Sequence, residues 1–292
     1  MKALVTGGGG QLSKALLRTA EEHHQVSMHS IETLDITCFD QVLRAVDEVR
    51  PDVIINAAAY TAVDKAESDE VTARFVNEDG PGNLARAASE HGSRLIHIST
   101  DFVFDGVSEN PWLTTDVPKP VSVYGRTKLA GERAIIDSDL DEWTVVRTAW
   151  LYDGDSPNFF STMLRLMKDR EEISVVSDQT GTPTLVDSLA VAVWCLADKN
   201  ISGMHHWTDD GCTTWHGFAT AIEEIGYRSG LLESRTRVDP ITTEEYPTPA
   251  RRPAYSVLDK TKTWNALEGT RAMPPIHWRE NLNNMITEKT RV

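Results

Sequence analysis

Short apolar runs alternate with longer segments of helical spacing along the first half of the chain. The runs are Lys2 to Val5, Gln25 to His29, Pro51 to Asn56, Arg94 to Ser99 and Trp143 to Thr148. Short, nearly continuous apolar runs are typical of strands that are buried on both faces of a parallel sheet. Segments such as 38–50 and 70–91 have helical spacing. The alternation predicts an α/β fold, with a doubly wound, right-handed parallel sheet of the Rossmann type.

The pattern loosens after Trp150. Helices are predicted over about 159–168, 186–197 and 214–225, and segments rich in Gly and Pro separate them. We therefore expect a dinucleotide-binding domain over residues 1–150 and mainly a smaller, C-terminal substrate-binding lobe over residues 151–292. Parts of the second segment are expected to return to the Rossmann core.

Charge and apolar content exclude several classes of protein. The chain has 292 residues and a net charge of −15, and this excess of acid argues against a nucleic-acid groove or a polybasic membrane surface. No apolar run approaches the ~18 residues of a membrane span. The first run, which ends at Gly7, is shorter than the apolar core of a signal peptide.

Cysteine and histidine spacing gives no sign of a metal site. Cys38, Cys195 and Cys212 are scattered, which favours reduced thiols in a cytoplasmic protein. The adjacent pairs at 23–24 and 205–206 lack a histidine partner one helical turn away, so we do not expect these histidines to be metal ligands.

The turn after the first strand has the pattern of a dinucleotide-binding motif. Four consecutive glycines begin at Gly7, between a predicted strand and a predicted helix. Gly7 suits a tight turn, and Gly10 lets backbone N–H groups approach a pyrophosphate at the helix N-terminus. Ser13 replaces the third glycine of the motif, and a small serine still allows close packing of helix on strand.

The residues that follow the next two predicted strands are also candidates for contacts with the dinucleotide. His29, Ser30 and Glu32 follow the second strand, with neither an acid at its end nor an arginine, which leaves NADH and NADPH both open. Three alanines at 57–59 follow the third strand. Small residues there leave room for a flat ligand at the carboxyl edge of the sheet.

Tyr124 and Lys128 are the candidate reactive pair. Their spacing of four places both side chains on one face of a helix. An ammonium beside a phenol lowers a pKa that starts near ~10, which suits Tyr124 to proton transfer. Thr100, at the carboxyl end of the fourth strand, is placed to hydrogen-bond a carbonyl oxygen that becomes an alkoxide. His97, inside that strand, is expected to be a core histidine with satisfied hydrogen bonds.

Taken together, these motifs resemble the extended short-chain dehydrogenase/reductase superfamily and, within it, the dTDP-4-dehydrorhamnose reductase family. The resemblance covers nearly the whole chain. Its most specific segments are 56–67, Asn-Ala-Ala-Ala-Tyr-Thr-Ala-Val-Asp-Lys-Ala-Glu, and 181–184, Gly-Thr-Pro-Thr. Further matching segments are 7–12, 34–37, 76–77, 99–106, 123–128, 147–152 and 252–256.

The resemblance implies a reaction and a set of roles. Hydride passes from NADPH or NADH to C4 of dTDP-4-dehydro-L-rhamnose, giving dTDP-L-rhamnose. Thr100 would hydrogen-bond the C4 oxygen, Tyr124 would protonate the new alkoxide, and Lys128 would lower the pKa of Tyr124 and hold the nicotinamide ribose. The implied cofactor contacts also include Gly7, Gly10, Gln11, Leu12, Asp35, Ile36, Ala57, Ala58, Ala59, Tyr60 and Asn77. The implied contacts to the nucleotide-sugar are Thr100, Asp101, Trp150, Asn158 and Arg252.

Two of these residues also have a purely structural interpretation. Asn77 lies inside the predicted helix over 70–91, where an asparagine usually faces water. Trp150 fits a core position as well as a substrate contact. Arg252 suits a diphosphate because its planar fork pairs with phosphate oxygens.

Some members of the family are homodimers with magnesium at the interface. No acidic positions of the second lobe match that site here, so a dimer and Mg²⁺ rest on the resemblance alone. Two alternatives to the rhamnose-forming reductase stay open. One is a 4-ketoreductase for another dTDP-6-deoxysugar, and the other is a non-catalytic role like that of the related regulatory subunit of methionine adenosyltransferase.

Overall fold

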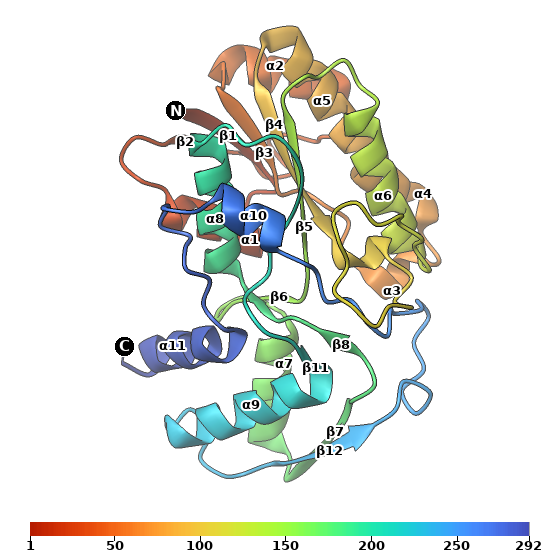
Figure 1. The fold of residues 1–292 in the computed structure, drawn as a ribbon, viewed down its shortest axis with the longest axis vertical. Helices are drawn as coiled ribbons and strands as arrows, with labels where there is room; N and C mark the ends of the chain where they lie inside the picture. The colour runs from red at the N-terminus through yellow and green to blue at the C-terminus, as the bar shows by residue number, and fades with distance from the viewer. Residues whose placement is uncertain (292) are drawn as a thin grey trace.

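The structure, a computed structural model that describes residues 1–291, is built on a six-stranded parallel sheet (Figure 1). The strand order is β10-β5-β4-β3-β1-β2, so the chain runs outward from β1 in both directions. This confirms the predicted Rossmann-type architecture. The bounds are β1 Lys2–Thr6, β2 Gln25–Met28, β3 Val53–Asn56, β4 Arg94–Thr100, β5 Trp143–Thr148 and β10 Gly203–His206.

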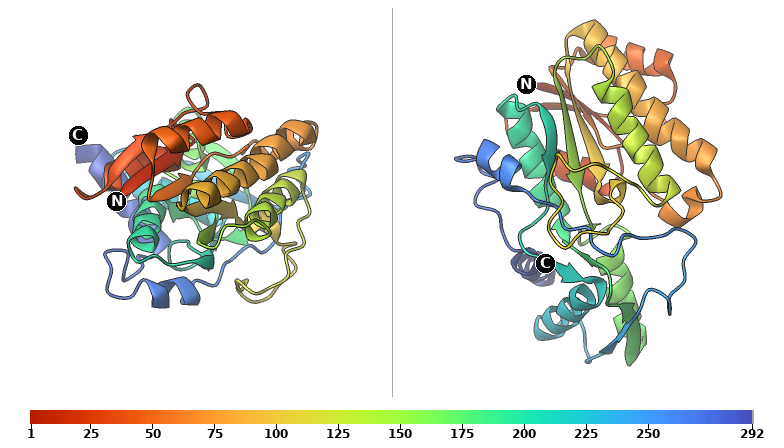
Figure 2. Two further views of the ribbon diagram at one scale, coloured as in Figure 1. Left: turned by 90° about the horizontal axis from the view of Figure 1, so that it is seen from above. Right: turned by 45° about the vertical axis from the view of Figure 1, so that its right-hand side comes forward.

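Helices cover both faces of this sheet, as Figure 2 shows. On one face, α1 (Gln11–Thr19) and α8 (Val186–Asp198) bury Leu12, Leu16 and Val193 against Val5 and Ile55. On the other face, α2 (Phe39–Val49) and α5 (Gly80–His91) pack with α6 (Val123–Ile136). The alternating side chains of each strand therefore enter two separate cores, which explains why the strands read as continuous apolar runs.

The segment predicted as one helix over 70–91 is interrupted by a π-helical turn. It consists of α4 (Glu70–Arg74), the π-helix η1 (Phe75–Asp79) and α5. Asn77 lies in the π-helical turn and is only 1% exposed, so the expectation that it faces water is wrong. The wider turn presents its side chain to neighbouring elements instead, and π-helical turns of this kind are frequent at functional sites.

A smaller helical part lies beyond the carboxyl edge of the sheet. It contains α7 (Phe159–Asp169), α9 (Trp215–Arg228) and α11 (Trp278–Arg291), whose apolar faces enclose a core that includes Tyr152, Phe160, Phe218 and Leu282. Short strand pairs complete it: β6 (Leu151–Tyr152) with β9 (Thr184–Leu185), β7 (Glu172–Val176) with β12 (Arg237–Ile241), and β8 (Thr180–Gly181) with β11 (Thr213–Thr214).

Part of the second half of the chain returns to the Rossmann core. Helix α8 packs on α1, and β10 adds the sixth strand beside β5. The helices predicted over 159–168, 186–197 and 214–225 are confirmed, whereas β10 and α11 were not predicted. The boundary drawn at residue 150 stays a prediction.

Two further expectations concern side-chain chemistry and membranes. The three cysteines are unpaired: Cys195 is buried, Cys38 is half-buried and Cys212 is exposed. Within residues 1–291, none of the helices combines the length and the apolar character needed to cross a membrane.

Candidate active site

Thr100, Tyr124 and Lys128 come together at the carboxyl edge of β4. Thr100 ends the strand, a 3-10 turn (Asp101–Val103, η2) follows, and Tyr124 and Lys128 lie in the first two turns of α6. A side chain at Gly125 would place its Cβ 2.2 Å from the carbonyl oxygen of Phe102, so only glycine lets α6 approach η2 this closely. That approach brings Tyr124 to Thr100.

The start of α6 is fixed by two further residues. The hydroxyl of Ser122 accepts a hydrogen bond from Gly125 N at 3.1 Å and caps the helix. The carboxylate of Glu67 accepts another from Val123 N at 2.8 Å. Sequence reasoning did not assign Glu67 a role, although it lies in the family-specific segment 56–67.

The phenol of Tyr124 is protonated near neutral pH. Burial raises its pKa to about 12, the nearby carboxylate of Asp101 acts in the same direction, and a hydrogen bond with Thr100 offsets part of this rise. The expectation that Lys128 lowers this pKa is wrong for this structure, because the pKa of Tyr124 is raised and Lys128 is not among the groups that shift it. The reason is that the Lys128 amine is directed at β4, where it donates to the carbonyl oxygen of Ile98 at 2.7 Å.

Asp101 stands beside this pair. Its carboxylate accepts a hydrogen bond from the Thr100 hydroxyl at 3.0 Å, and its side chain is buried. Burial raises the pKa of Asp101 to about 6, although hydrogen bonds from Ser256 and Thr100 act against the rise. Ser256 belongs to the segment between β12 and α10 (Thr261–Ala266), so residues from both parts of the chain meet at Asp101.

The glycine turn has the shape that a dinucleotide requires. Gly7 has a φ of +73°, and a Cβ there would lie 2.7 Å from the backbone of Ala57 and Ala58. Helix α1 begins after Gly10 without any side-chain cap, which leaves its first N–H groups available to a pyrophosphate. Ser13 is fully buried and donates to Gly7 O at 2.8 Å, so it packs the helix on the turn as predicted. These residues fit a dinucleotide with its pyrophosphate at the start of α1.

The loop after β3 lies next to this turn. Two hydrogen bonds join Asn77 to the backbone of Tyr60: its side-chain oxygen accepts from Tyr60 N at 2.8 Å, and its nitrogen donates to Tyr60 O at 3.1 Å. The same nitrogen donates to the Thr127 hydroxyl at 3.1 Å. Asn77 therefore ties the loop that begins with Ala57 to helix α6. A direct contact between Asn77 and the cofactor stays a prediction.

Asp35 and Ile36 lie in the connection between β2 and α2. The Asp35 carboxylate accepts hydrogen bonds from the backbone N–H and the hydroxyl of Thr37, at 2.9 and 2.8 Å. Ile36 is buried against Gly80, at the first turn of α5. At the end of β2, the exposed Glu32 has a lowered pKa because of a hydrogen bond from Ser30. The side chains at this edge still leave NADH and NADPH open.

Two predicted substrate residues have structural partners. Trp150 has a φ of +47° and stacks on Trp215 with ring centroids 3.5 Å apart. The Asn158 side chain caps α7 by accepting from Ser161 N at 3.0 Å, and it donates to the Gln11 side chain at 3.1 Å. Asn158 therefore connects the helical part to the start of α1, and its contact with substrate stays a prediction.

Arg252 is held in place by Asp64. The guanidinium donates to both carboxylate oxygens, to the Thr248 hydroxyl and to Ala250 O. The pair is partly exposed, and the pKa of Asp64 is lowered chiefly by its hydrogen bond with Arg252. Asp64 was not singled out from the sequence, because its partner lies in the last fifth of the chain.

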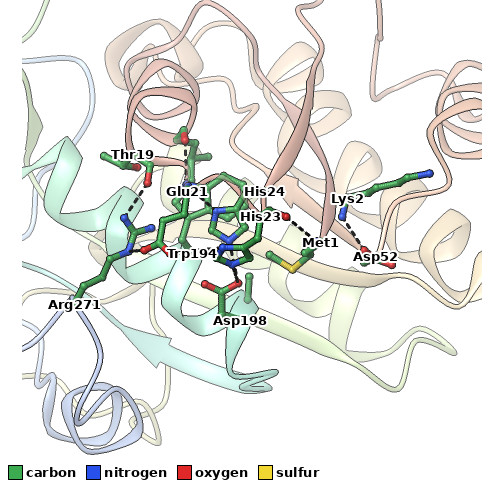
Figure 3. Close-up of polar contacts among 12 residues, drawn as sticks. Met1, Lys2, Thr19, Glu21, His23, His24, Asp52, Trp194, Asp198 and Arg271 are labelled. Carbon is green, nitrogen blue, oxygen red and sulfur yellow. Dashed lines mark hydrogen bonds and ion pairs between the residues drawn. The ribbon is translucent and has the colours of Figure 1, made fainter.

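His23 and His24 do have a common partner, Asp198 of α8, as Figure 3 shows. Among the described residues this is the only group of three ligand atoms that lie within 4.8 Å of one another. However, the Nδ1 atom of His24 accepts a hydrogen bond from Glu21 N at 3.0 Å, so in the neutral ring Nε2 carries the proton that it shares with Asp198. A metal at Nε2 would require the other tautomer, and nitrogen donors are not the ligands that Mg²⁺ prefers. That these histidines are not metal ligands stays a prediction.

A doubly wound sheet, a glycine turn at its carboxyl edge and the Thr100, Tyr124 and Lys128 constellation define an oxidoreductase of the short-chain dehydrogenase/reductase type. The chain matches the family model described as "RmlD substrate binding domain" over residues 1–291 and belongs to that family. It thereby confirms the resemblance seen in the sequence.

Individual relatives agree with this membership. The chain is 42% identical over 271 residues to a dTDP-4-dehydrorhamnose reductase of Burkholderia thailandensis, covering 88% of this chain and 90% of the relative. It is 39% identical to the enzyme of the same name from Aggregatibacter actinomycetemcomitans, over 97% of this chain and 98% of that one. A crystal structure of dTDP-4-dehydrorhamnose reductase from Bacillus anthracis in complex with NADP matches with a TM-score of 0.91 and 36% identity, covering 98% of this chain and 99% of the other.

Proposed function

We propose that this protein reduces the C4 ketone of dTDP-4-dehydro-L-rhamnose to the alcohol of dTDP-L-rhamnose, with NADPH or NADH as hydride donor. Family membership and the names of the full-length relatives support the reaction. The observation that carries the proposal is the meeting of Thr100, Tyr124 and Lys128 at the edge of the sheet that also bears the glycine turn. The NADP complex of the Bacillus anthracis structure favours a nicotinamide cofactor.

The residues of the site divide the work of the reduction. A bound nicotinamide supplies the hydride, and the ketone oxygen gains negative charge as it becomes an alkoxide. Thr100 hydrogen-bonds that oxygen, and Tyr124 gives it a proton. A phenol with a pKa of about 12 keeps its proton at neutral pH, which is the form that a donor needs. Lys128 holds the ribose beside the nicotinamide, as the resemblance implies.

The nucleotide-sugar would be bound by residues from both parts of the chain. Arg252, oriented by Asp64, is assigned to the diphosphate, and Asp101 and Trp150 to the sugar. Asn158 is assigned a place between the two ligands because it also contacts Gln11. A homodimer and a cytoplasmic location remain predictions from the resemblance and from the free cysteines.

The test follows nicotinamide absorbance with purified protein and enzymatically generated dTDP-4-dehydro-L-rhamnose. NADPH and NADH are supplied in separate reactions, and the sugar product is identified. Oxidation with dTDP-L-rhamnose as product supports the proposal and settles the cofactor. A protein that binds nicotinamide but oxidises neither cofactor would refute it, and stoichiometric binding of a methionine adenosyltransferase would then favour the regulatory role.

A further inference from the structure

A chain of buried hydrogen bonds crosses three strands and ends at the amine of Lys128. Thr6 of β1 donates to the side-chain oxygen of Asn56 at 2.6 Å, the Asn56 nitrogen lies 2.9 Å from His97 Nδ1, and His97 Nε2 lies 3.3 Å from Lys128 Nζ. All four residues are at most 2% exposed. His97 is thus a core histidine with partners at both nitrogens, as predicted, but one of them is a residue of the active site.

The orientation of the Asn56 side chain is determined by the backbone. Its oxygen accepts a hydrogen bond from Ala58 N at 3.1 Å. A backbone N–H only donates, so this oxygen cannot be exchanged with the nitrogen. The Asn56 amide nitrogen therefore faces His97 and donates to Nδ1. Because Nδ1 accepts, a neutral His97 carries its hydrogen on Nε2.

The Nε2–H group of His97 is directed at Lys128. An ammonium has three donors and no acceptor, so a charged Lys128 would face His97 donor to donor. A neutral amine has a lone pair that accepts from Nε2–H while one of its own hydrogens bonds Ile98 O. We propose that His97, fixed in its Nε2–H tautomer by Asn56, is a positioning residue that favours the neutral amine of Lys128 over its ammonium form.

The charged groups around Lys128 do not overturn this arrangement. Glu132, one turn further along α6, favours the ammonium, but its carboxylate already accepts from Arg147 at 2.9 and 2.6 Å and from Ser99 at 2.5 Å. Tyr124, one turn earlier, keeps its proton and carries no charge. Burial lowers the pKa of Lys128 to about 8 in spite of Glu132.

The groups that face His97 agree with a neutral ring. Burial and the neighbouring Lys128 hold the pKa of His97 well below its usual range. Its other neighbours along the chain of hydrogen bonds, Asn56 and Thr6, do not titrate. The proton that titrates near neutral pH at this pair therefore belongs to Lys128.

The tautomer is measured directly, in the free full-length protein, by nitrogen NMR of histidine-labelled samples between about pH 6 and pH 9. The expected spectrum shows His97 with a protonated Nε2 and a bare Nδ1 throughout, and its ring signals shift with a midpoint near 8 as Lys128 titrates. The H97Q variant assigns the signals, and K128M should abolish the midpoint. A protonated Nδ1 would overturn the proposal. This measurement needs no substrate, so it is independent of the proposed reaction.

The variant N56D tests the cause. An aspartate accepts from Ala58 N with one oxygen and from His97 Nδ1–H with the other, so the tautomer should switch and Nε2 should accept from the ammonium. The midpoint should then rise by about one pH unit or more. An unswitched tautomer or an unmoved midpoint in N56D would contradict the account.

Kinetics supply a second readout that rests on the proposed function. The alkaline limb of the kcat/KM profile should move to higher pH in N56D with the NMR midpoint. H205Q is the matched control, because His205 is a buried histidine of β10 that bonds Thr263 and Ser202 instead of the active site. Its alkaline limb should stay in place, and an equal shift in both variants would reduce the role of His97 to general core packing.

Discussion

Arg252 and Asp64 form a two-point ion pair, with Nη1 to Oδ1 at 3.0 Å and Nη2 to Oδ2 at 2.8 Å. The pair joins the short helix α3 (Val63–Ala66), which comes after β3, to the segment that follows β12, and Asp64 also accepts from Ala250 N at 3.1 Å. The planar fork of the arginine is thereby held in one orientation before any ligand binds. Such preorganisation reduces the ordering cost of binding a diphosphate.

Loss of this orientation should weaken binding of the nucleotide-sugar. In D64N the guanidinium loses its charged partner, and we expect KM for the sugar substrate to rise about tenfold while nicotinamide affinity changes little. R252K should likewise raise KM for the sugar substrate, because an ammonium lacks the planar fork that pairs with a diphosphate. Steady-state kinetics and cofactor titration check both effects. An unchanged KM in both variants would show that Arg252 does not contact the substrate.

Removal of the Tyr124 hydroxyl should separate chemistry from binding. The Y124F ring keeps its edge-to-face contact with Phe102, whose ring centroid lies 5.5 Å away, so the fold should persist. Turnover should fall by about 10²-fold or more because the proton donor is lost, whereas cofactor affinity should stay within a few-fold. Near-normal turnover in Y124F would show that another group protonates the product.

Protonation of His206 should contribute to acid lability. Burial lowers its pKa to about 3, and Nδ1–H donates to Asp259 O at 3.1 Å. Because the folded pKa lies below the unfolded value of about 6.5, this stability is present above about pH 6.5 and is lost as the pH falls toward 3. When the pH falls from about 7.5 to about 5, the decrease of the unfolding free energy should therefore be roughly 2 kcal/mol smaller in H206N than in the wild type.

Urea titrations of both proteins at the two pH values test this expectation. The raised pKa values of Asp101 and Asp209, each about 6, act in the opposite direction but equally in both proteins. They therefore cancel in the comparison. Equal decreases of the unfolding free energy in the wild type and in H206N would contradict the assigned role of His206.

The Gly7 turn should be intolerant of a methyl group. In G7A the new Cβ would meet the backbone of Ala57 and Ala58 at 2.7 Å as well as the left-handed φ of +73°. Gly230 is the matched control, since it has a φ of +79° but, its own chain neighbours aside, none of the atoms of residues 1–291 lies within 4 Å of its Cβ position. We expect G230A to cost about 1 kcal/mol and G7A clearly more, with loss of nicotinamide binding. Equal melting temperatures for G7A and G230A would show that the contact with the β3 loop is unimportant.

The parts of the site that could be predicted are those with local causes. Spacing alone predicts the local geometry of four glycines between a strand and a helix. It does the same for a tyrosine four residues before a lysine. The strands β1 to β5 were readable because burial on both faces gives continuous apolar runs. The glycine turn and the Thr100, Tyr124 and Lys128 constellation follow from these features.

The remainder depends on partners that are distant in the chain. β10 contains His205 and His206, and two adjacent polar residues do not predict a buried strand. Thr263 and Asp259, some fifty residues later, supply their hydrogen bonds. The direction of the Tyr124 pKa shift was also missed, since spacing alone does not reveal that Lys128 is directed toward His97 and Ile98.

The most direct test of the central claim follows the hydride itself. Purified protein is given dTDP-4-dehydro-L-rhamnose and nicotinamide cofactor that carries deuterium at the transferred position, and the sugar is examined by proton NMR and mass spectrometry. The account predicts one deuterium at C4 of dTDP-L-rhamnose, and no such product with Y124F in the same time. Deuterium at another carbon, a C4 epimer as the product, or no transfer by protein that binds the cofactor would contradict it.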